Sequence, residues 1–78
     1  MAKFLGGCKP GECGVVVRVA GEGKIRRRLF DMGVTPGATF TVRKVAPLGD
    51  PIEITLRGYE LTLRKAEGDC VEIREGEQ

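Results

Sequence analysis

The chain has 78 residues, of which 41% are hydrophobic and 31% charged, which indicates a single folded domain over residues 1–78 and excludes a disordered chain. So short a chain has little volume for an enclosed substrate pocket, and it contains no His and no Ser, so we expect neither an enzyme nor a bound cofactor. The net charge of +2, from 13 basic and 11 acidic residues, is too balanced for a dedicated nucleic-acid binder.

The first elements expected are a strand and a short helix. Residues 13–20 predict the strand, and the two-residue period places on one face Cys13, Val15, Val17 and Val19. Residues 24–32 predict the helix, whose apolar stripe consists of Ile25, Leu29 and Met32. We expect Gly33 to end the helix in the left-handed conformation, with Val34 in contact with Leu29.

A second strand is expected over residues 38–45. In it Phe40 and Val42 face one way and Val45 the other, which predicts a bulge or a strong twist. The loop that follows, residues 46–51, contains two prolines.

The C-terminal part alternates apolar and polar residues in two further strands, 52–57 and 59–64, joined by a hairpin turn at Gly58. A turn at residues 66–69 precedes a last strand, whose inward residues are Val71 and Ile73. Five short strands and one short helix predict a mainly β fold that closes on itself as a small barrel. Closure would leave no unpaired sheet edge to cover.

Two segments are informative beyond their pattern of apolar and polar residues. They are RRLFDMGVTPG at residues 27–37 and APLGDPI at residues 46–52. A valine strand precedes the first, and Leu61-Thr62-Leu63-Arg64-Lys65 follows the second. Together they resemble the two signature blocks of the FeoA family, bacterial ferrous iron transport protein A. The resemblance extends from Leu5 to Ile73.

The resemblance implies an SH3-like β-barrel with one short inserted α-helix. It also implies a small cytoplasmic accessory of ferrous iron transport, whose partner is a membrane permease with a cytoplasmic GTP-binding domain. The same type of domain occurs at the end of metal-dependent transcriptional repressors. Cys8 and Cys13 are not part of the family pattern, so the resemblance says nothing about a metal there.

The loop over residues 46–51 is the first candidate for partner binding. Pro47 and Pro51 each fix φ, so the loop is stiff before docking and loses little entropy on binding. Leu48 at the tip and Asp50 are the candidate contacts. Alternatively, Leu48 plugs the end of the barrel and Asp50 caps nearby backbone amides, and the sequence leaves both interpretations open.

The helix is the second candidate surface, through Arg26, Arg27, Arg28 and Phe30. Aromatic residues and arginine are enriched at binding hot spots. The alternative, which we favour for Phe30, is packing beneath the N-terminal segment near Phe4 or Leu5. The arginines would then be a solvated face.

The three cysteines, Cys8, Cys13 and Cys70, are the candidates for a metal site. A structural zinc site normally needs four ligands, and with no His and no fourth Cys we do not expect a metal there. Cys13 is instead expected in the core and Cys70 facing outward. An odd number of cysteines favours a reducing cytoplasm over a disulfide framework, and no stretch approaches the roughly 20 apolar residues of a membrane span.

The leading hypothesis is therefore a protein-binding module that regulates ferrous iron transport by contacting the permease. A nucleic-acid-associated or repressor-type module that uses residues 26–28 is the second hypothesis, although the near-neutral charge counts against it. A carrier that binds a transition metal through its cysteines is the third.

Overall fold

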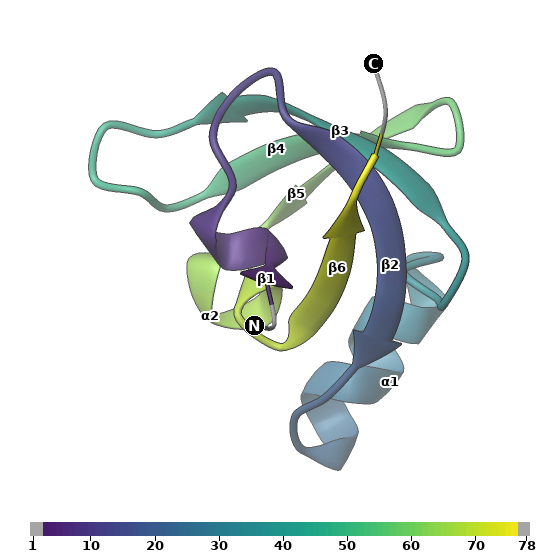
Figure 1. Ribbon diagram of the computed structural model, residues 1–78. Coiled ribbons are helices and arrows are strands. Elements are labelled where there is room, and N and C mark those ends of the chain that lie inside the picture. Colours follow the sequence, from purple (N-terminus) through teal and green to yellow (C-terminus); the bar gives the residue numbers. More distant parts are fainter. Residues whose placement is uncertain (1–2, 77–78) are drawn as a thin grey trace.

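The computed structural model describes residues 3–76. Within that range the chain forms one six-stranded antiparallel sheet with the strand order β1-β6-β2-β3-β4-β5, curved as Figure 1 shows. The elements in chain order are β1 (Lys3–Phe4), the 3₁₀ helix η1 (Leu5–Gly7), β2 (Cys13–Val19), α1 (Gly23–Asp31), β3 (Thr39–Val45), β4 (Ile52–Leu56), β5 (Tyr59–Leu63), α2 (Lys65–Gly68) and β6 (Val71–Glu75). The expected mainly β fold with a short inserted helix is confirmed.

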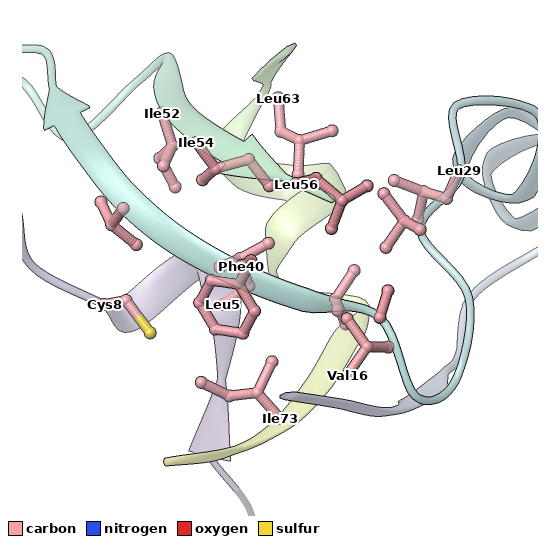
Figure 2. Close-up of a cluster of buried hydrophobic side chains, with 14 of the residues drawn as sticks. Leu5, Cys8, Val16, Leu29, Phe40, Ile52, Ile54, Leu56, Leu63 and Ile73 are labelled. Carbon is pink, nitrogen blue, oxygen red and sulfur yellow. The ribbon is translucent and has the colours of Figure 1, made fainter. Parts of the chain in front are cut away.

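The core lies inside the curved sheet and is built from aliphatic side chains, with Phe40 among them (Figure 2). On β4 the alternation predicted from the sequence is confirmed, because Ile52, Ile54 and Leu56 are all fully buried. On β6 the inward residues are Val71 and Ile73, also as predicted. The bulge expected in β3 is present as well, since the register with β4 shifts between Val42 and Lys44.

The inward face of β2 differs from the prediction. The buried positions are Gly14, Val16 and Val19, while Val17 is 44% exposed. A bulge between Val16 and Arg18 breaks the two-residue alternation, so both halves of the strand can turn a valine inward. Only glycine fits at position 14, because a Cβ there would lie 3.2 Å from the Phe40 ring and clash with the carbonyl oxygen of Arg74.

Helix α1 packs on the sheet through its predicted stripe. Leu29 is fully buried, and Ile25 and Met32 pack against the core while remaining partly exposed. The helix ends as expected at Gly33, whose φ is 91°, with backbone hydrogen bonds from Gly33 N–H to the Phe30 oxygen and from Val34 N–H to the Leu29 oxygen. This pair of bonds is a Schellman motif, which satisfies carbonyls at the end of a helix.

A second contact holds the end of α1 on the barrel. The Tyr59 hydroxyl, at the start of β5, donates a hydrogen bond to the Met32 carbonyl. A Cβ at Gly33 would collide with the same hydroxyl oxygen. Tyr59 therefore lies across the helix end and is 44% exposed, although its place in the alternating strand groups it with the buried Leu63.

The sheet is not closed by strand pairing, contrary to the expectation of a closed ring. Among residues 3–76, β1 and β5 are the two edge strands, and they do not pair with each other. The segments that follow these edges, η1 after β1 and α2 after β5, pack against each other and cover the opening (Figure 1). The sequence analysis missed β1 and η1, and it expected a turn at residues 66–69 where the structure has α2.

No helix within residues 3–76 combines the length and apolar character needed to span a membrane.

Candidate functional site

The loop between β3 and β4 presents one large apolar side chain to solvent. Leu48 is 95% exposed, so it does not plug the end of the barrel. The loop is held by backbone hydrogen bonds from Gly49 N–H to the Ala46 oxygen (2.7 Å) and from Ala46 N–H to the Pro51 oxygen (3.1 Å). An exposed leucine thus lies at the tip of a turn whose backbone is fixed.

Asp50, at the base of the same loop, makes a structural hydrogen bond. Its Oδ1 accepts a hydrogen bond of 3.0 Å from the backbone N–H of Lys65, the first residue of α2. This agrees with the interpretation that Asp50 caps nearby backbone amides, and a carboxylate at a helix start is also favoured by the helix dipole. Asp50 therefore fixes the loop to α2.

Arg28 of α1 reaches the other side of α2. Its Nε lies 3.1 Å from Oε2 of Glu67, whose side chain is only 8% exposed. The second carboxylate oxygen of Glu67 accepts a 2.9 Å hydrogen bond from the backbone N–H of Arg64, the N-cap residue of α2. Glu67 was missed by the sequence analysis, and its only signal is a position three residues after the N-cap.

These contacts bring Arg28 and Asp50, which were predicted on separate surfaces, to one shallow groove of about 450 Å³. The groove is lined by Arg28, Asp50, Pro51, Thr62, Arg64 and Glu67; we call it the α2 groove. Two of its charges, Arg28 and Glu67, are paired with each other. Among the other lining residues, Thr62 and Arg64 are exposed and offer a hydroxyl and a guanidinium to a partner.

Phe30, Arg26 and Arg27 lie away from the groove, on the exposed side of α1. Phe30 is 39% exposed, so the favoured prediction that it packs beneath the N-terminal segment is wrong. The guanidinium of Arg26 lies over its ring, 5.3 Å from the centroid, at the distance of a cation–π contact. From the N-terminal segment it is Leu5 that is buried in the core.

The cysteines are three free thiols at separate places. Cys8 is buried in the core (Figure 2), and burial raises the pKa of its thiol. Cys13 is only half-buried, because the inward position of β2 belongs to Gly14, and Cys70 is also half-buried instead of facing outward. Within residues 3–76, no three or more Cys, Asp and Glu side chains are grouped so as to hold a metal ion.

Comparison with known families identifies the family to which the chain belongs. The family model described as the FeoA domain matches residues 4–75. The chain belongs to the FeoA family. This FeoA chain is 38% identical over 63 residues to the Fe(2+) transport protein A/Fe(2+) transporter FeoB fusion protein of Porphyromonas gingivalis, an alignment that covers 81% of the chain and 8% of the fusion protein. The family is thus one of proteins associated with ferrous iron transport.

Solved structures place the FeoA chain in the same fold. A FeoA-like protein from Clostridium acetobutylicum superposes with a TM-score of 0.90 at 32% identity, covering 99% of this chain and 90% of the other. FeoA of Stenotrophomonas maltophilia, solved with zinc and described as an SH3 domain protein, gives 0.80 at 22% identity over 92% and 89% of the two chains. A manganese-dependent transcriptional repressor gives 0.89 at 16% identity over 96% and 41%. At such low identities the last two show the fold alone, a small SH3-like barrel.

Proposed function

We propose that this FeoA chain is a non-catalytic accessory of ferrous iron transport that binds the cytoplasmic GTP-binding domain of the ferrous iron permease. The observation that carries the proposal is the relative in which a FeoA segment and the transporter FeoB form one polypeptide. Covalent fusion keeps two partners at a high effective concentration, which is useful when they act together.

The tip of the β3–β4 loop and the adjacent α2 groove form the proposed contact surface. Leu48 is 95% exposed, and burying a leucine side chain on binding contributes about 1.5–3 kcal/mol. The loop is fixed at both ends, by its own backbone hydrogen bonds and by Asp50 on α2. Docking it therefore costs little conformational entropy. The expected complement is an apolar pocket for Leu48 beside an acidic group for Arg64.

The test is an NMR titration of the labelled chain with the soluble GTP-binding domain of the cognate transporter. We expect chemical shift changes at residues 46–51 and around Thr62 and Arg64. Leu48→Asp should weaken binding about 10- to 100-fold, because the apolar contact is lost and a charge is buried.

The matched control is Val17→Asp, since Val17 is also an exposed apolar residue, at 44%, but lies on β2. It should leave the affinity unchanged, and thermal unfolding should show that both variants are folded. Equal affinities of wild type and Leu48→Asp would show that the loop is only structural. A titration without any shift changes would exclude this domain as the partner.

A further inference from the structure

The exposed side of α1 carries three cations that form no ion pair within residues 3–76. We define the outer α1 face as Lys24, Arg26, Arg27 and Phe30. Of the four basic residues of α1, only Arg28 takes part in an ion pair within residues 3–76. Lys24, Arg26 and Arg27 are all exposed.

The placement of these cations disfavours the helix itself. The first turn of α1 contains no acidic residue, and the side chain of the N-cap residue, Glu22, makes no capping hydrogen bond. Cations near a helix N-terminus interact unfavourably with the helix dipole. The acidic residues at the two ends, Glu22 and Asp31, form no ion pair with the outer α1 face in the described part of the chain. The three cations therefore do not stabilise the helix through ion pairs within the described residues, and they remain accessible to a partner.

An apolar ring lies among the cations. Phe30 is 39% exposed and remains on the surface with Arg26 stacked over it. A basic face with an exposed aromatic residue is the composition of helices that lie in a membrane interface, where the ring enters the headgroup region and the cations meet the anionic lipids.

The outer α1 face is also open to a partner. Two shallow hollows of about 460 and 490 Å³ lie along the exposed side of α1, with Arg27 and Asp31 in the wall of both. Figure 1 shows α1 projecting from the barrel, so that its outer side is not covered by another element. A leaflet offers anions at any spacing, whereas an acidic protein segment has to match the positions of the three cations.

We propose that the outer α1 face lies against the anionic headgroups of a lipid bilayer. The proposal rests on the proposed function for its location, because an accessory bound to a membrane transporter is held beside the leaflet. Beside the leaflet the effective concentration of lipid headgroups around α1 is high, so even a weak interaction keeps the helix on the membrane. The α2 groove, on the Arg28 side of the same helix, stays available for the transporter.

The experiment uses Phe30→Trp as a reporter, since the chain contains no other Trp. Its fluorescence should shift to the blue with vesicles that contain about one-third phosphatidylglycerol, but not with pure phosphatidylcholine vesicles. The shift should disappear when salt is raised from about 0.05 M to about 0.5 M. In this background, replacing both Lys24 and Arg27 by Gln should weaken binding about 25-fold, at roughly five-fold per cation.

The matched control replaces Lys44 on β3 and Arg74 on β6 by Gln. Both are exposed cations without an ion pair in the described residues, and the net charge changes equally. Unchanged binding of this control supports the proposal. Equal weakening of both pairs, the absence of a blue shift, or an equal blue shift with soluble polyglutamate would overturn it. No transporter is present in the assay, so its failure is distinct from failure of the Leu48 titration.

Discussion

Arg27 and Arg28 are neighbours in the sequence with different surroundings. Arg28 lies 3.1 Å from the buried carboxylate of Glu67 on α2, whereas Arg27 has no ion pair in the described part of the chain. The pair joins two helices that lie far apart in the sequence. A buried carboxylate that loses its cation keeps its desolvation cost.

We predict that Arg28→Met lowers the free energy of unfolding by about 0.5–1 kcal/mol, the range of a partly exposed ion pair. Arg27→Met, the same change one residue earlier, should be nearly neutral. Urea unfolding of both variants measures the difference, and equal destabilisation would show that the contact with Glu67 contributes nothing.

Lys3 connects three segments at the edge of the barrel. Its Nζ lies 2.8 Å from a carboxylate oxygen of Glu12 and 2.5 Å from one of Glu75. Glu12 also accepts a 2.6 Å hydrogen bond from the backbone N–H of Lys9. The hydrogen bond from Lys3, followed by the one from Lys9, lowers the pKa of Glu12 below its ordinary value of 4.5.

Because the pKa of Glu12 is lower in the folded chain, its stabilising contribution is complete above pH 4.5 and is lost as the pH falls through the folded value. We predict that Glu12→Gln lowers the melting temperature at about pH 7, and that the difference from wild type shrinks towards about pH 3. Glu53→Gln, at an exposed carboxylate without an ion pair in residues 3–76, is the control. A difference that does not vary with pH would contradict the role assigned to the Lys3 contact.

At the scale of the elements, α1 depends on its packing. Nine residues are too few for a helix that is stable alone, and Leu29 is its only buried side chain. The Schellman motif and the Tyr59 hydroxyl hold the C-terminal end. The position of the outer α1 face is therefore determined by contacts on the opposite side of the helix.

We predict that Leu29→Ala destabilises the chain by about 2–5 kcal/mol, because it removes a fully buried side chain. Thermal or urea unfolding measures this cost. The control is Val17→Ala at an exposed site, which should change stability by less than about 0.5 kcal/mol. An unchanged melting temperature for Leu29→Ala would show that α1 does not pack as described.

The alternation of apolar and polar residues predicted the inward face of those strands in which no bulge or glycine interrupts it. The inward residues of β4 and β6 follow the two-residue period directly. In β2 the prediction failed because an inward position is occupied by Gly14, which has no apolar side chain to reveal it, and because the bulge at Val17 changes the phase. Helix α2 was missed because four residues are too few for a helical periodicity.

Only the part of the candidate site that lies within one loop could be predicted from the sequence. The stiffness of the 46–51 loop follows from its two prolines, and the exposure of Leu48 was one of two interpretations that the sequence left open. The α2 groove joins residues that lie up to 39 positions apart, from Arg28 to Glu67. No periodicity in a single sequence reports such a distant contact, so its assembly required the structure.

At the scale of the whole molecule, the barrel is completed by packing between η1 and α2 and not by a closed ring of strands. The expectation of closure counted five strands and missed β1. The short β1 pairs only with β6 within the described residues, at Lys3 with Ile73 and Phe4 with Glu72.

The position of β6 between β1 and β2 has a consequence for the synthesis of the chain. While the polypeptide emerges from the ribosome, β3, β4 and β5 can pair with their neighbours as soon as residues 39–63 are available. The N-terminal β1 and one side of β2 wait for residues 71–75. The native barrel therefore forms only after nearly the whole domain has been translated, and its assembly depends on a slow, non-local pairing step.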